Sequence, residues 1–63
     1  MTPTAILLEV QKLHDVSARL DYFAGQHPAA EEGLLAISAH VRNSAALLEV
    51  LVKTKISPGS ELQ

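Results

Sequence analysis

The sequence predicts an all-α protein, an antiparallel two-helix hairpin that dimerises into a four-helix bundle. Two observations predict the hairpin. Apolar residues recur at helical spacing in both halves of the chain, and the segment Gly25-Gln26-His27-Pro28 separates the two rows. A third observation predicts the dimer, because apolar residues remain outside both rows and concentrate at the end of the hairpin far from the turn.

The first helix is expected from about residue 3 to about residue 24. Thr2 and Thr4 are both candidate N-caps, and Pro3 suits the first helical position if Thr2 is the cap. Gly25 suits a left-handed residue at the C-terminal cap. Apolar side chains then follow the four-three spacing of one helix face, with Ser17 as the polar member of the row. This row comprises Ile6, Val10, Leu13, Ser17, Leu20 and Ala24.

The turn is expected at about residues 25–28 and the second helix at about residues 29–55. Its apolar row, in which Ser44 is the polar member, comprises Leu34, Ile37, Val41, Ser44, Leu48 and Leu51. Residues 1–56 form the hairpin domain, and residues 57–63, which read SPGSELQ, are expected to be a flexible tail. The side chains expected to be best buried are Leu13, Leu20, Ile37, Val41 and Leu48.

The small size of the chain favours self-association. A domain of 63 residues buries little surface by itself, and the absence of cysteine excludes disulfides as the remedy. Two hairpins together enclose a true core. The predicted oligomer interface consists of Leu7, Leu8, Leu47 and Val50, which lie outside the main rows, together with Leu51 of the second row. A second copy of the chain is the expected partner, and another helical protein is the alternative.

Charge and hydropathy narrow the partners further. The formal net charge of -2 disfavours a non-specific nucleic-acid binder, which normally carries a basic excess. The start of the chain lacks the basic region of a signal peptide, and no uninterrupted apolar run reaches membrane-spanning length. We therefore expect a cytoplasmic protein that makes no membrane contact.

The polar residues form no recognisable catalytic, cofactor or metal motif. His14, His27 and His40 lack the spacing that places two ligands on one helix face, although a histidine cluster across a dimer axis stays open. Two further pairs, Asp15 with Arg19 and Glu49 with Lys53, are spaced as surface ion pairs. The sequence therefore predicts no enzyme, cofactor or metal site.

The two serines in the apolar rows have two possible roles, and the two aromatic residues have different expected environments. Ser17 and Ser44 either bond back to a carbonyl of their own helix, which is the favoured interpretation, or act as polar register devices in the core. Phe23 is expected in the core beside the turn, and Tyr22 is expected to be exposed.

The length and the hairpin layout resemble those of the plasmid copy-number protein Rop, which dimerises into a four-helix bundle and grips paired RNA loops. The layout is also similar to that of small hairpin co-chaperones of bacterial secretion systems, which bind a partner through an apolar helix face. Neither resemblance extends to a motif residue. The sequence thus predicts a small non-enzymatic interaction protein that self-associates, with an RNA-binding regulator or a docking co-chaperone as alternatives.

Overall fold

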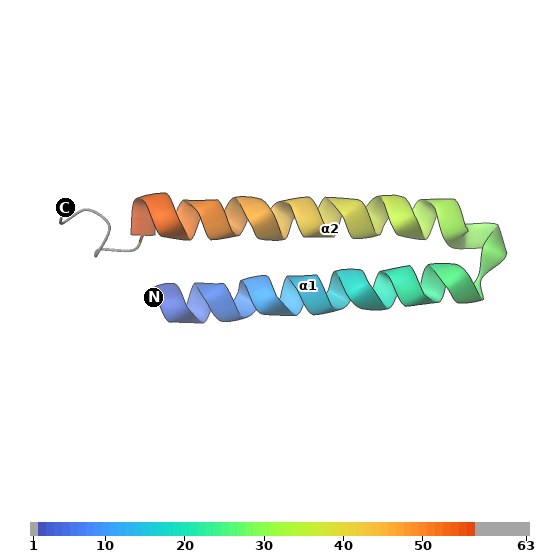
Figure 1. Cartoon of the computed structure of the whole chain (residues 1–63), viewed down its shortest axis with the longest axis horizontal. Coiled ribbons are helices and arrows are strands. Elements are labelled where there is room, and N and C mark those ends of the chain that lie inside the picture. The colour runs from blue at the N-terminus through green and yellow to red at the C-terminus, as the bar shows by residue number, and fades with distance from the viewer. Residues whose placement is uncertain (1, 57–63) are drawn as a thin grey trace.

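The computed structural model describes residues 2–56, which are helical almost throughout. Helix α1 spans Pro3–Gln26, a 3₁₀ turn η1 spans Pro28–Ala30, helix α2 spans Glu31–Leu51, and a π-helical segment η2 spans Val52–Ile56 (Figure 1). No strand occurs within residues 2–56, so the all-α prediction is confirmed there. The predicted tail, residues 57–63, lies outside the described residues.

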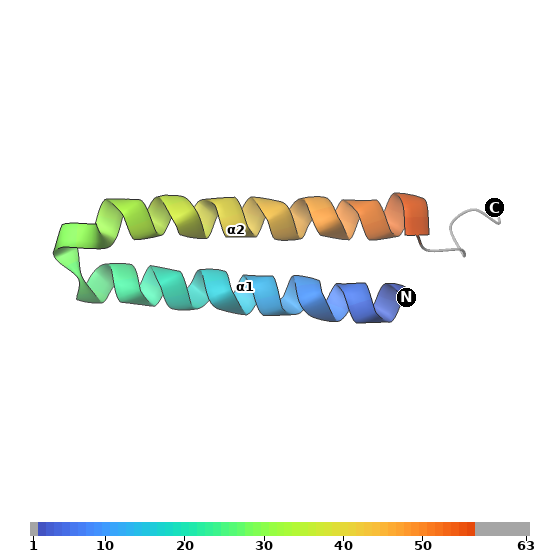
Figure 2. The same cartoon turned by 180° about the vertical axis from the view of Figure 1, so that it is seen from behind.

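Helices α1 and α2 lie side by side and antiparallel in both views of the molecule (Figure 1 and Figure 2). The start of α1 and the end of the second helical segment therefore share one end of the hairpin, and the turn occupies the other.

The first helix begins as its sequence indicates but ends differently. The Thr2 hydroxyl accepts a hydrogen bond from the Ala5 N–H at 3.1 Å, so Thr2 is the N-cap and Pro3 the first helical residue. The predicted left-handed cap at Gly25 is wrong, because Gly25 lies inside α1 and no described residue has a positive φ. The helix ends instead at His27, whose φ of -131° and ψ of 82° leave the helical region, as expected for a residue before proline.

The turn is short and closed by hydrogen bonds. The His27 N–H donates to the Phe23 carbonyl at 3.0 Å, and the Ala30 N–H donates to the His27 carbonyl at 2.9 Å. Pro28 opens the 3₁₀ turn, and Glu31 and Glu32 occupy the first turn of α2, where carboxylates favour the positive end of the helix dipole.

The two helices contact each other along a row of small residues that repeats every seven positions. We call this row the seam. Its buried members are Val10, Ser17 and Ala24 on α1, Ser38 and Ala45 on α2, and Val52 at the start of η2. Small side chains at every closest contact allow the two backbones to approach closely, and the seven-residue repeat keeps one stripe facing the neighbouring helix.

The seam corrects the predicted register of the second helix. Ser38 and Ala45 are 0% exposed, whereas Ile37 is 53% exposed and Leu51 and Ser44 are also exposed. Ile37, Ser44 and Leu51 each lie one residue before the seam, about 100° away from it, whereas Leu34, Val41 and Leu48 lie four residues before it, about 40° away. The other four residues expected to be best buried, Leu13, Leu20, Val41 and Leu48, are only half-buried. The predicted row of the first helix does contain its buried seam residues, Val10, Ser17 and Ala24. The prediction failed for the second helix because it assigned large apolar side chains to the contact, where Ser38 and Ala45 lie.

Candidate functional site

The centre of the seam is polar. Ser17 on α1 and Ser38 on α2 lie opposite each other, and their hydroxyl oxygens are 2.7 Å apart. The Ser38 hydroxyl also donates to the Ser17 carbonyl at 3.0 Å, and the Ser17 hydroxyl lies 3.3 Å from the Ser38 carbonyl. Ser17 thus bonds across the hairpin, not back to its own helix as the favoured interpretation held.

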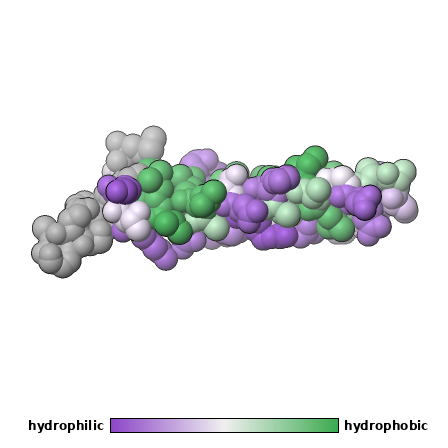
Figure 3. All heavy atoms as spheres, turned by 90° about the horizontal axis from the view of Figure 1, so that it is seen from above, coloured by the Kyte–Doolittle hydropathy of each residue, from purple (hydrophilic) through white to green (hydrophobic). Residues whose placement is uncertain are grey.

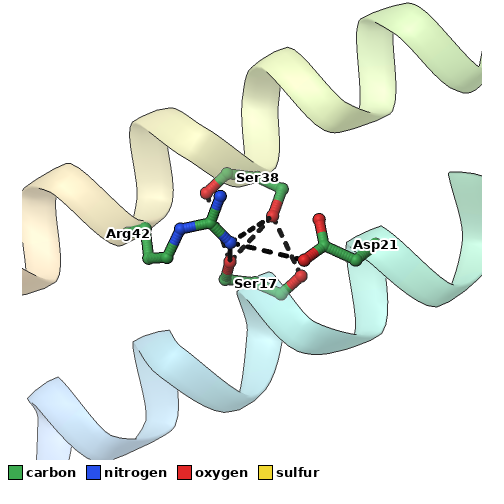
Figure 4. A network of polar contacts seen from close by, with 4 residues as sticks. All are labelled: Ser17, Asp21, Ser38 and Arg42. Carbon is green, nitrogen blue, oxygen red and sulfur yellow. Dashed lines mark hydrogen bonds and ion pairs between the residues drawn. The ribbon is translucent and has the colours of Figure 1, made fainter.

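Arg42 joins this layer to the surface (Figure 4). Its Nη1 donates to the Ser17 hydroxyl at 2.9 Å and to Asp21 Oδ2 at 3.3 Å, and it lies 3.5 Å from the Ser38 hydroxyl. Arg42 and Ser38 are one helical turn apart on α2, as are Asp21 and Ser17 on α1, which brings the four side chains together. The sequence signal for this cluster is a charged residue four positions after each seam serine.

One arrangement of protons satisfies the whole cluster. The Ser38 hydroxyl donates to the Ser17 carbonyl, the Ser17 hydroxyl donates to the Ser38 hydroxyl, and the two protons of Arg42 Nη1 go to Ser17 and Asp21. Within residues 2–56 every buried side-chain nitrogen or oxygen has a hydrogen-bond partner. A fully satisfied polar layer does not carry the cost of an unpaired buried group.

The same geometry does not activate a nucleophile. The Ser17 hydroxyl is buried and accepts a hydrogen bond from Arg42, a side chain that stays protonated and so cannot remove a proton from it. The arrangement suits a structural and orienting role.

The ion pair between Asp21 and Arg42 identifies the two sides of the hairpin. Each residue lies four positions after a seam serine, and the two meet at 3.3 Å, so residues in this relation to the seam lie on one side of both helices. We call this side the ion-pair face. It also carries His14 and Glu49, together with Leu7 and Leu35.

The opposite side of the hairpin is apolar. Residues four positions before a seam residue, or one position before it, lie on this side. All six residues that lie four positions before a seam residue are apolar. Four of the six residues that lie one position before a seam residue are apolar, and the other two are Glu9 and Ser44. We call this side the apolar face: Ile6, Leu13, Val16, Leu20, Phe23, Leu34, Ile37, Val41, Leu48 and Leu51. Every member is half-buried or exposed in the single hairpin.

The five predicted interface residues are all exposed but do not form one surface. Leu51 belongs to the apolar face and Leu7 to the ion-pair face, while Leu8, Leu47 and Val50 project from the outer sides of the helices. Hydrophobic atoms gather at the end of the molecule where the helix termini lie, and hydrophilic atoms cover much of the middle (Figure 3). Leu47, Val50 and Leu51 occupy the last turns of α2 at this end.

The predicted surface ion pairs and the two aromatic residues lie at separate places in the structure, outside the buried seam. The Glu49–Lys53 pair forms at 3.2 Å, whereas Asp15 and Arg19 are not among the ion pairs of the described residues. Tyr22 is exposed as predicted, but Phe23 is 45% exposed and is not in the core of the single hairpin. Its ring meets that of Tyr22 edge-on at 5.8 Å.

The histidines do not converge within the part of the chain that the structure describes. His27 Nδ1 lies 3.1 Å from the Phe23 carbonyl, His14 is half-buried and His40 is exposed. No group of three or more histidine, cysteine or carboxylate side chains suited to a metal ion occurs among residues 2–56.

One helical segment, Pro28–Lys55, is long and apolar enough to cross a membrane by length and composition, with a window of mean hydropathy 1.3. These two properties are shared by core helices of soluble proteins. Arg42 and its partner Asp21 lie near the middle of the hairpin, where charges are costly in a bilayer.

Comparison of the chain with protein-family models, with characterised proteins and with solved structures finds no match.

Proposed function

We propose that this chain is a small non-enzymatic interaction protein that acts as a homodimer, with the apolar faces of two hairpins packed together as a four-helix bundle. One observation carries the proposal. Among residues 2–55, whose burial the structure describes, the only buried apolar side chains are those of Val10, Ala24, Ala45 and Val52. Every leucine, isoleucine and aromatic ring among residues 2–55 retains exposed surface.

This distribution is the reverse of the one in a self-sufficient domain. Large aliphatic side chains contribute most of the burial energy of a fold, about 1.5–3 kcal/mol each when fully buried. Here the seam holds valine, alanine and serine, and five of the nine leucines among residues 2–55 line the apolar face together with Phe23, Ile6 and Ile37. The single hairpin therefore has a contact surface but little core, and packing against a second surface would supply the core.

A second copy of the chain is the occupant that the face itself favours. The face runs from Ile6 and Leu48 at the open end to Phe23 and Leu34 at the turn, so it extends along both helices. Two such faces related by a two-fold axis present the same half-exposed leucines to each other, as an isologous interface requires. Glu9, the one charged residue at a face position, already pairs with Lys12 at 3.1 Å.

Light scattering on the purified chain tests the proposal. We expect a mass of two chains and a melting temperature that rises with protein concentration, because association stabilises the folded state. A chain that is monomeric at high concentration and melts at a constant temperature contradicts the homodimer. The apolar face would then be assigned to a different helical protein.

A further inference from the structure

We propose that the Asp21–Arg42 ion pair, anchored on the Ser17–Ser38 layer, restricts self-association to the apolar face and so ends assembly at the dimer. This inference rests on the proposed homodimer and adds the residues that determine which face is used. It follows from the position of the pair on the hairpin.

The ion-pair face carries apolar side chains as well as the pair, and its other polar members are His14 and Glu49. The ion-pair face carries Leu7 towards the open end and Leu35 towards the turn, both exposed. Arg42 lies between them along the hairpin, and Asp21 lies level with Leu35; the two side chains are 50% and 42% exposed. A flat rod with two apolar faces would stack without limit, because each added copy leaves another face open.

Hydrogen bonds to the buried seam fix the position of the ion pair. Arg42 Nη1 bonds both the Ser17 hydroxyl and Asp21, and Ser17 and Ser38 are buried in the seam. A free surface arginine can fold along an apolar surface and cover it. Arg42 is bonded instead across the seam, so a charged group stays over the middle of this face and packing a second hairpin against it would require desolvating that charge.

The test replaces the pair by two leucines, Asp21→Leu with Arg42→Leu, which leaves neither charge without a partner. The matched control is Asp15→Leu with Asn43→Leu. It adds the same two side chains to the same two helices at exposed positions on neither face. Both are compared with the wild type by light scattering over a range of concentrations, with helicity followed by circular dichroism.

We expect the ion-pair variant to form assemblies with an average mass at least about twofold above that of the wild-type dimer, while the control stays dimeric. Equal assembly by both variants would mean that added hydrophobicity alone is responsible and would overturn the inference. A dimeric ion-pair variant of native helicity would overturn it as well. If the double variant loses helicity, the single change Arg42→Met, which keeps a long side chain, replaces it. Assemblies larger than the dimer support the inference, and a dimer of native helicity overturns it.

The wild-type measurement separates this inference from the proposed function. A monomeric wild type contradicts the homodimer before any substitution is considered. A dimeric wild type with an unchanged ion-pair variant contradicts only the role of Asp21 and Arg42.

Discussion

At the scale of single residues, the hairpin depends on what small side chains do at its seam. Alanine at Ala24 and Ala45 allows close contact without leaving a polar group unpaired. Ser17 and Ser38 occupy equivalent positions, and their hydroxyls bond each other and the opposite backbone. The serines therefore act as one unit, and their contributions to stability should not be independent.

A double-mutant cycle on the two serines tests this coupling. Ser17→Ala should lower the free energy of unfolding by about 1 kcal/mol, because Ser38 and Arg42 lose a partner. Ser17→Ala with Ser38→Ala should cost less than the two single changes added together, since alanine already fits the seam. Chemical denaturation at one protein concentration measures all four proteins. Additive costs would show that the hydroxyls do not act together.

A substitution at Ala45 tests whether a larger side chain fits between the two helices. The Ala45 side chain is 0% exposed, so Ala45→Leu should force the helices apart and destabilise the fold by about 1–3 kcal/mol. The control is Ala46→Leu at the exposed neighbouring position, which should change stability by less than about 0.5 kcal/mol. Thermal denaturation of the two variants distinguishes them. Equal stability would mean that residue 45 does not lie at the closest contact.

At the scale of the helices, the local sequence is sufficient to predict the two helices and the turn but not which stripe of α2 faces α1. Proline positions and apolar spacing predict two helices and the turn, because these depend on neighbours in sequence. The facing stripe of α2 depends on which side chains α1 can accommodate, a tertiary property. The rows beginning at Leu34 and at Ser38 are both helical in period, and only packing against Ser17 favours the second.

Gly25 gives the sharpest test at this scale. It lies within α1, has no positive φ, and an added Cβ would meet no atom within 4 Å. Gly25→Ala should therefore stabilise the protein by about 0.5–1 kcal/mol, through better helix propensity. The melting temperature should rise, at about 4–8 °C for each kcal/mol. A lower melting temperature would indicate a left-handed residue at this position, as the sequence alone suggested.

At the scale of the whole molecule, one side of the seam is almost wholly apolar, and the other carries the Asp21–Arg42 ion pair beside Leu7 and Leu35. The sequence predicted an excess of apolar surface and placed it at the open end, where Leu47 and Val50 are indeed exposed. It did not predict the continuous apolar face, because the residues that form it had been assigned to the contact between the helices. Nor did it predict the Arg42 cluster, whose members become neighbours only when Ser17 and Ser38 are aligned.

The measurement that tests the apolar face most directly is the mass of two matched variants, Ile37→Glu and Val50→Glu, by light scattering at equal concentration. Both residues are β-branched and lie on α2, and they are similarly exposed in the single hairpin, at 53% and 55%. Only Ile37 belongs to the apolar face. We expect Ile37→Glu to yield monomers with reduced helicity, because a dimer would bury its carboxylate without a partner, and Val50→Glu to remain dimeric. A dimeric Ile37→Glu variant of native helicity would contradict the account. Dissociation by Val50→Glu alone would place the interface instead at the open end of the hairpin, where Leu47 and Val50 are exposed.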